Sequence, residues 1–310
     1  MKVDNENSVT WRRLILGDTL TRWPDDILIM DVARVGQVNW PIERCILVSD
    51  RLETATLIET MIACGAQHFI QSANPRFNHA VNLAAAMIGD PLTFIDKPIE
   101  SYFAYRTKDY QSISFPFRNS KEKLKTLQQV LDYGRACGVR ENMEDVLRGI
   151  ADELFTNAIY SAPRDLEGRP KYLTTQRNMY VELDANVNAE IFVAHDEQIL
   201  IIGCIDTYGS LKPQKVAGML KKCYSSGTNQ AMDLSSGGAG FGCFLMMEQS
   251  SNFSLMVNPG QKSLIFASIL LGLTLKASAI IPKNLHLVTV AKEGIGQDEA
   301  NAKLIGIFDN

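Results

Sequence analysis

The sequence predicts an α+β protein built from two parts, and three observations support this prediction. Residues 25–90 alternate short apolar runs with helical patterns, an order that is typical of parallel β-α units. Residues 112–160 hold two amphipathic helical patterns. Residues 188–271 contain apolar runs separated by short polar turns, which indicates hairpins. The expected divisions are a smaller N-terminal α/β domain, a linker and a larger C-terminal domain, at residues 1–97, 98–111 and 112–310.

In the N-terminal part, the pattern predicts three strands and two helices. The second helix, 75–88, would have Pro75 in its first turn, where the missing N–H of proline costs no hydrogen bond. The strands are expected at 25–32, 43–49 and 67–71, and the first helix at 53–64. The following residues, 91–119, are rich in aromatics but show no helical period. We expect them to pack between the domains.

The C-terminal part opens with a short strand at 113–117, which Pro116 places at a sheet edge because it cannot donate to a ladder. The next pattern predicts a helix with Ser120 as N-cap and Gly138 as its stop. The core residues of this helix would be Leu124, Leu127 and Leu131. A second helix, 144–160, would bury residues that recur at i+4: Val146, Ile150, Leu154 and Ala158.

Composition and charge argue against several classes of protein. The 310 residues carry a formal net charge of -4 and no basic stripe, so we expect no nucleic-acid partner. The six cysteines show no CxxC spacing, which favours reduced thiols and a cytoplasmic location over a zinc site. The N-terminal residues lack the apolar segment of a secretory signal. Residues 263–281 are mostly apolar, but Lys276 interrupts them, so a buried strand and a second element are expected rather than a membrane span.

Glu153 and Asn157 lie four residues apart in the second helical pattern. That spacing puts both side chains on one face of a helix, beside the core stripe. Asparagine is an oxygen ligand for Mg²⁺, and glutamate can take a proton from a nucleophile. A solvent-exposed polar face is the alternative that this spacing leaves open.

Two further features favour a nucleotide site. Asp206 closes a strongly apolar strand, and a buried carboxylate is costly unless it has a partner such as the amino group of a purine. The stretch GGAGFG at 237–242 precedes an apolar helical run, so its backbone N–H groups would lie at a helix N-terminus, where phosphate binds. It fits neither a dinucleotide fingerprint nor a P-loop. An Asp-led turn and a flexible glycine turn are the alternatives.

Taken in order, the motifs ELFTNA, DTYGSL, GAGFG and NPGQKS resemble the GHKL ATPase superfamily. This superfamily includes histidine-kinase catalytic domains, anti-sigma-factor serine kinases, gyrase B, the large heat-shock chaperones and MutL. The resemblance covers residues 112–271 and implies a Bergerat-type α/β sandwich with a mixed sheet that binds ATP and Mg²⁺. An insertion at 163–181 and a C-terminal extension at 272–310 depart from the short anti-sigma kinases, and we expect partner-binding or dimer surfaces there.

The resemblance implies roles residue by residue. Asn157 would coordinate the Mg²⁺, and Asp206 would accept a hydrogen bond from the adenine amino group. Ser263 would support that contact through its hydroxyl, and Gly209 would let the chain pass close to the base. The phosphates would be wrapped by Gly238, Gly240 and Gly242. Residues 212–236 would form a mobile lid, with lysines that either contact phosphate or are merely solvated: Lys212, Lys215, Lys221 and Lys222.

Glu153 helps to choose a branch of the superfamily. Anti-sigma-type serine kinases, gyrase B and MutL carry Glu at that position, where it resembles a general base, whereas histidine-kinase domains often carry Asn. The residues that lead into the ELFTNA motif are also most similar to the serine-kinase type. His79 lies on a predicted helix but lacks the acid that follows a phospho-acceptor histidine, so we expect a structural role for it.

The N-terminal part resembles the second half of a response-regulator receiver. Asp31 would match the phospho-acceptor and Ser49 the switch hydroxyl. However, Gln71 and Ser72 stand where receivers have Lys-Pro, and too few residues precede Asp31 for the missing β-α-β-α and its acidic Mg²⁺ pair. We therefore expect a degenerate, truncated receiver-like module that serves docking or dimerisation.

Together the resemblances imply a cytoplasmic signalling protein, related to two-component systems, that binds Mg·ATP. It would phosphorylate a partner protein on Ser or Thr, or act as a weak ATPase, with Glu153 as the catalytic base. One alternative is a nucleotide-dependent interaction module that transfers nothing. Another is a stand-alone histidine-kinase catalytic domain acting in trans. The expected partner is a protein, and a homodimer is also allowed.

Overall fold

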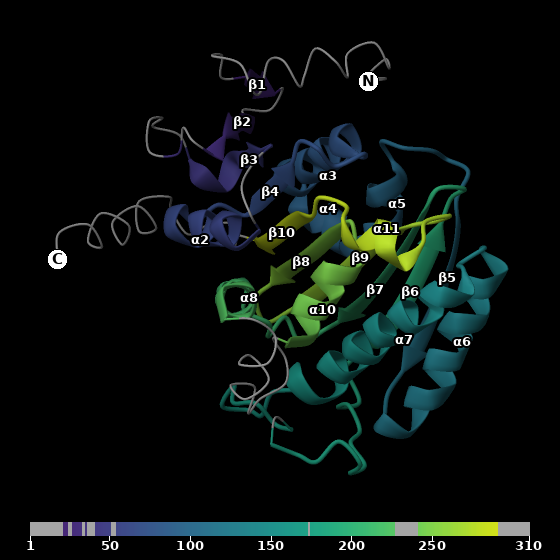
Figure 1. Cartoon of the computed structure of the whole chain (residues 1–310). Coiled ribbons are helices and arrows are strands. Elements are labelled where there is room, and N and C mark those ends of the chain that lie inside the picture. The colour runs from purple at the N-terminus through teal and green to yellow at the C-terminus, as the bar shows by residue number, and fades with distance from the viewer. Residues whose placement is uncertain are drawn as a thin grey trace.

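In the described part of the chain, a mixed ten-stranded sheet runs through the computed structural model, in the order β1-β2-β3-β4-β10-β8-β9-β7-β6-β5 (Figure 1). Both parallel and antiparallel neighbours occur in it, and helices pack against it. This confirms the prediction of a mixed α/β fold. The structure describes residues 21–23, 27–32, 35, 41–50, 54–172, 174–226 and 241–290.

The N-terminal part follows the predicted order of strands and helices. Its elements are β1 (Thr21–Trp23), β2 (Ile27–Asp31), η3 (Ile42–Arg44), β3 (Cys45–Ser49), α2 (Thr54–Cys64), β4 (His68–Gln71) and α3 (Phe77–Gly89). As predicted, β2, β3 and β4 run parallel. β3 is buried along its whole length, which explains its continuous apolar run CILVS.

Two short helices follow where the sequence predicted a stretch with no helical period, so that prediction was wrong. They are α4 (Pro91–Asp96) and α5 (Pro98–Phe103), and each begins with a proline in its first turn. The Asp90 side chain caps α4 by accepting from Thr93 N at 3.0 Å. Three aromatics of this stretch, Phe94, Tyr102 and Phe103, are buried in one cluster with residues of β6, β7, β8 and β9, whereas Tyr105 is 55% exposed.

The C-terminal part begins at β5 (Gln111–Phe117), which pairs with β6 and ends the sheet among the described strands, as Pro116 predicts. The helices that follow are η4 (Ser120–Glu122), α6 (Lys123–Ala136), α7 (Glu141–Thr156), η5 (Asn157–Ser161), α8 (Pro213–Ser226), α10 (Phe241–Gln249) and α11 (Leu275–Ala279). The strands are β6 (Ala189–His195), β7 (Ile199–Asp206), β8 (Asn252–Asn258), β9 (Lys262–Leu270) and β10 (Asn284–Thr289). Both predicted hairpins, β6–β7 and β8–β9, are confirmed.

The apolar stretch 263–281 forms β9 and α11, as expected for a buried strand followed by a second element. In the described part of the chain, no helix has the length and apolar character needed to cross a membrane. All six cysteines are free thiols, and each is buried or half-buried.

The start of α6 differs from the prediction in two ways. Asn119, not Ser120, is the capping residue: its side chain accepts from Lys121 N at 3.1 Å, while Glu122 accepts from Asn119 N at 3.2 Å. Leu124 is 81% exposed, because the buried stripe of α6 runs through Thr126, Leu127, Val130 and Leu131. Leu127 and Leu131 are therefore confirmed as core. Gly138 ends the helix at φ +85°, as predicted.

The sheet is covered on both faces, which gives three layers. One cluster of buried residues joins the strands to α2, α6, α7, α8 and α10. Two others join them to α3, α4 and α5. β6 shows the alternation: Ile191 and Val193 belong to the first cluster, and Phe192 and Ala194 to the opposite one. The predicted core stripe from Val146 to Ala158, which runs through α7 into η5, is buried in the first cluster.

β10 joins the two parts of the chain into one sheet. It pairs antiparallel with β4, where His286 is opposite His68, and parallel with β8, where His286 is opposite Ser254. This strand belongs to the extension 272–310, which we expected to be a partner-binding or dimer surface. β10 instead fills a central position in the sheet, between β4 and β8. The predicted domain boundary therefore falls within a continuous sheet.

A buried chain of polar side chains crosses this junction. His68 Nδ1 lies 3.1 Å from His286 Nδ1, and His286 Nε2 lies 2.9 Å from Asn252 Oδ1. Because an amide oxygen only accepts, His286 must carry its proton on Nε2, and its Nδ1 then accepts from His68 Nδ1–H. Burial lowers the pKa of both rings, to about 3 for His68. Both histidines are therefore neutral in the folded protein.

Acid is expected to weaken this junction. Since the folded pKa of His68 lies below its usual 6.5, the unfolded chain binds the proton first. The contribution of His68 to stability is complete above about pH 6.5 and is lost toward pH 3, at roughly 1.4 kcal/mol per pH unit. His68→Asn keeps a donor near the position of Nδ1 but does not titrate. Urea unfolding of both proteins between neutral pH and about pH 4.5 should give a shallower decline for the variant. Equal slopes would contradict this account.

Candidate functional site

Asn157, the predicted Mg²⁺ ligand, begins a π-helical turn, η5, that continues α7. The N–H of Ala162 donates to Asn157 O at 2.8 Å, a bond from i+5 to i. Such turns frequently occur at functional sites. Asn157 is 3% exposed, and neither Oδ1 nor Nδ2 makes a hydrogen bond of ordinary geometry with a described residue, although the amide lies close enough to Glu153 to lower the pKa of that carboxyl. A solvent-exposed polar face is therefore excluded for Asn157.

Glu153 lies one turn earlier, half-buried, against the start of α10. A side chain at Gly242 would collide with the Glu153 carboxyl group, so the last glycine of the GAGFG motif is in contact with the ELFTNA motif. Burial raises the pKa of Glu153 above its usual 4.5, and nearby Asn157 and Arg177 partly offset this rise. Gly238 and Gly240 lie outside the described residues.

Asp206 is 4% exposed at the end of β7, directly opposite Ser263 on β9. Burial raises its pKa to about 6, although Tyr208 N donates to its Oδ1 at 2.9 Å. The Asp206 carboxylate therefore ends a buried strand and also leads a turn, so the structure agrees with both the buried-carboxylate and the Asp-led-turn interpretations of the sequence. Ser263 is fully buried, and its hydroxyl makes no hydrogen bond of ordinary geometry with a described residue, although it lies close enough to lower the pKa of Asp206.

Gly209 is required by the turn that follows. Its φ is +57°, and a side chain there would collide with Asn258 O in the β8–β9 turn. Gly260 N also donates to Gly209 O at 2.9 Å. The glycine thus holds the DTYGSL segment against the NPGQKS turn, and its closeness to a base stays a prediction.

Two site residues were missed by the sequence analysis. Ser161 ends η5, and its hydroxyl is buried without a partner among the described residues. Its only signal was the position four residues after Asn157. Arg164 donates to Ser161 O at 2.6 Å and to Ser210 O at 3.3 Å, and its charge lowers the pKa of Asp206. Arg164 therefore ties the end of η5 to the segment after β7.

These contacts bring separate motifs together and leave several polar atoms without partners. The buried atoms of this region that make no hydrogen bond of ordinary geometry with a described residue are Asn157 Oδ1, Asn157 Nδ2, Ser161 Oγ and Ser263 Oγ. Each unsatisfied buried group costs about 1–3 kcal/mol. A polar ligand that reached them would remove that cost. The described residues include no group of three or more His, Cys, Asp or Glu that could hold a metal. A Mg²⁺ ion here would therefore depend on Asn157 and on oxygens of a ligand.

The structure describes the predicted lid, 212–236, only over residues 212–226. Pro213–Ser226 form α8, a helix whose Val216, Leu220 and Cys223 are buried. Lys221 Nζ lies 3.3 Å from Glu59 Oε1 on α2, so this lysine is directed toward α2. Residues 227–236 lie outside the described residues.

The receiver-like residues end three parallel strands and so lie along one edge of the sheet. Asp31 is half-buried at the end of β2, and Ser49 is buried at the end of β3. Gln71 ends β4, and its Oε1 accepts from Lys283 N at 2.9 Å. Gln71 therefore holds the start of β10. Both ring nitrogens of His79 are buried, and its ring packs 4.8 Å from that of Tyr102, as expected of a structural residue.

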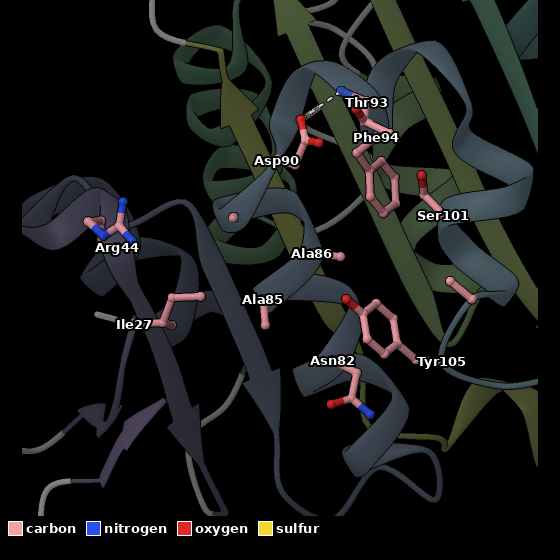
Figure 2. A pocket seen from close by; sticks show the side chains of 12 residues that line it. Ile27, Arg44, Asn82, Ala85, Ala86, Asp90, Thr93, Phe94, Ser101 and Tyr105 are labelled. Carbon is pink, nitrogen blue, oxygen red and sulfur yellow. Dashed lines mark hydrogen bonds between the residues drawn. The ribbon is translucent and has the colours of Figure 1, made fainter. Parts of the chain in front are cut away.

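A separate pocket of about 570 Å³ lies against α3, α4 and α5 (Figure 2). None of the predicted ATP-site residues lines it. Figure 2 shows Phe94 and Tyr105 on one side and Ile27 and Arg44 on the other, with Asn82, Ala85 and Ala86 between them. These helices belong to the layer opposite α7 and α10, so the pocket is distinct from the site described above.

No protein-family model matches the chain, and no curated protein matches it significantly. The sequence motifs and the geometry of the site therefore carry the functional conclusion.

Proposed function

We propose that the chain binds Mg·ATP in the manner of the GHKL superfamily and transfers the γ-phosphate to a serine or threonine of a partner protein. One observation carries this proposal. Side chains from separate motifs converge around η5, and several of their buried polar atoms have no partner in the described structure. A nucleotide could place its base beside Asp206 and Ser263 and its phosphates beside Asn157.

The adenine base of the nucleotide would lie beside Asp206. Its pKa of about 6 leaves the carboxylate ionised at neutral pH, so it can accept from the adenine amino group. Ser263 lies opposite Asp206 across the strand pair, and its hydroxyl, which already lowers the pKa of Asp206, would join that contact. The phosphates would lie toward Asn157 and Gly242, and a bound Mg²⁺ would neutralise their charge.

Glu153 would act as the general base of the transfer. Its carboxylate contacts Gly242 at the start of α10, where phosphate would be held by backbone N–H groups. The hydroxyl oxygen of the acceptor would attack the γ-phosphorus while Glu153 takes the hydroxyl proton. The bond from phosphorus to the β–γ bridging oxygen breaks, and ADP leaves. Burial raises the pKa of Glu153, which brings it nearer to the working pH of a base.

A nucleotide-dependent interaction module is the second candidate, and the position of α10 favours it. This helix starts at the phosphate end of the site, and its last turn contacts the residue before β10, where Lys283 Nζ donates to Glu248 O at 2.7 Å. Phosphate binding at the glycine motif would therefore move α10 and change its contact with Lys283, at the junction with the N-terminal strands.

Calorimetric titration with ATP and ADP, with and without Mg²⁺, tests the common part of both candidates. We expect binding that Mg²⁺ strengthens, followed by slow release of γ-phosphate. Acid-stable phosphate on a partner would support transfer to Ser or Thr, and acid-labile phosphate would support a histidine acceptor. Binding without hydrolysis or transfer would favour the interaction module. A protein that binds no nucleotide would contradict both.

A further inference from the structure

The insertion 163–181 is attached to η5 at both ends. At its start, Arg164 donates to the backbone of Ser161 and Ser210. At its end, the hydroxyl of Tyr160 contacts Arg177 O at 2.8 Å and Met179 O at 3.2 Å. The same five-residue turn that carries Asn157 therefore holds the insertion.

Further contacts fix the end of the insertion against the start of α6. Ser120 Oγ accepts from Val181 N at 3.0 Å and donates to Met179 O at 3.3 Å. Lys121 Nζ lies 5.0 Å from the centre of the Tyr180 ring. These contacts hold residues 177–181 beside η5 and the start of α6.

Arg177 is an exposed cation with no carboxylate paired to it among the described residues. Its guanidinium carbon lies 4.7 Å from the centre of the Tyr160 ring, a distance at which the ring attracts a cation. Its charge also lowers the pKa of Glu153. By contrast, Arg169 of the same insertion is paired with Asp165 at 2.8 Å and Glu167 at 2.9 Å.

The nearby lysine is already engaged. Lys123 Nζ lies 2.7 Å from Asp152 Oδ1 and 3.2 Å from Thr156 Oγ1. Arg177 is thus the cation beside Glu153 that has no anionic partner in the described part of the chain. A planar guanidinium offers two parallel N–H donors, which match two oxygens of one phosphate.

We propose that the insertion forms one side of the ATP site and that Arg177 contacts the terminal phosphate of bound ATP. The inference rests on the proposed function, because it requires ATP at Asp206 and Asn157. It changes the expected role of residues 163–181 from a surface for partners to a part of the site. Arg177 would neutralise charge on the γ-phosphate and hold it near Glu153.

The test compares ATP, ADP and AMP binding, with Mg²⁺, in the wild type, Arg177→Gln and Arg169→Gln. Losing a charge-assisted contact should weaken ATP binding of Arg177→Gln by about 10- to 100-fold. ADP should lose much less, and AMP should be unaffected. Arg169→Gln serves as the matched control, because it removes an arginine from the same insertion, and should bind all three nucleotides as the wild type does.

The outcomes separate this inference from the proposed function. A wild type that binds no nucleotide would overturn both. Normal ATP binding by Arg177→Gln, beside a wild type that binds ATP, would overturn the inference alone. Equal weakening for all three nucleotides would show a structural role and would also overturn it. Arg177→Lys guards against misfolding, because it keeps the charge and should retain a preference for ATP over ADP and an unchanged melting temperature.

Discussion

Asp206→Asn is expected to abolish measurable ATP binding and, at the same time, to stabilise the nucleotide-free protein. The amide would present a donor where the adenine amino group needs an acceptor, a mismatch that costs about 100-fold or more in affinity. In the folded protein, burial raises the pKa of the carboxylate to about 6 from its usual 3.8. That shift corresponds to roughly 3 kcal/mol of destabilisation by the charged form. Calorimetry and urea unfolding would measure the two effects.

The pH dependence of this stabilisation has a definite sign. Because the folded pKa of Asp206 lies above its unfolded value, the folded protein binds the proton more tightly. Its contribution to stability is therefore complete below about pH 3.8 and is lost as the pH rises through about 6. The variant and the wild type should be equally stable near pH 3.8, and the variant should reach its full extra stability above about pH 6.

Asp31→Asn is the matched control. Asp31 also ends an apolar strand, β2, which lies far from β7 in the order of the sheet. It should leave ATP binding unchanged. Normal ATP binding by Asp206→Asn would remove the adenine contact from the proposal. A loss of stability at neutral pH would mean that the attraction between Asp206 and Arg164 outweighs the cost of burial.

Local patterns explain which parts of the fold could be predicted. The stripe from Val146 to Ala158 and the β6–β7 hairpin depend on neighbours a few residues apart, so periodicity predicts them. The helices α4 and α5 are too short to show a period, and their aromatics are held by burial against the sheet. The position of β10 depends on His68, 218 residues away from His286, and no local signal specifies that pairing.

The same distinction applies to the site. Asn157, Asp206 and Ser263 stand in motifs whose order and spacing could be seen in the sequence. Arg164 and Arg177 lie in an insertion without a pattern, and their positions depend on contacts with Ser161, Ser210 and Tyr160 that no local signal specifies. The π-helical turn at Asn157 could not be predicted either, because the sequence continues a regular helical period through residue 160.

Glu153→Gln is expected to leave ATP affinity close to that of the wild type and to remove phosphate transfer. A general base typically contributes about 10²- to 10⁴-fold to rate, so γ-phosphate release should fall by that factor. Glutamine is the appropriate replacement because it keeps the shape that packs against Gly242. The wild-type rate should also fall on the acid side, at a pH above 4.5, since burial raises the pKa of Glu153 and only its ionised form accepts a proton.

Asp152→Asn is the matched control for this variant, because it removes the same charge from the adjacent position. Asp152 pairs with Lys123 at 2.7 Å and has a side chain that is 46% exposed, so it does not reach Gly242 in the way that Glu153 does. Its replacement should preserve the rate. If Glu153→Gln released γ-phosphate as fast as the wild type, with the same acid limb, another group would have to accept the proton. If the wild type bound ATP but released no phosphate, there would be no proton transfer for Glu153 to assist. The contact between Glu153 and Gly242 would then serve to couple nucleotide binding to α10, as the interaction module requires.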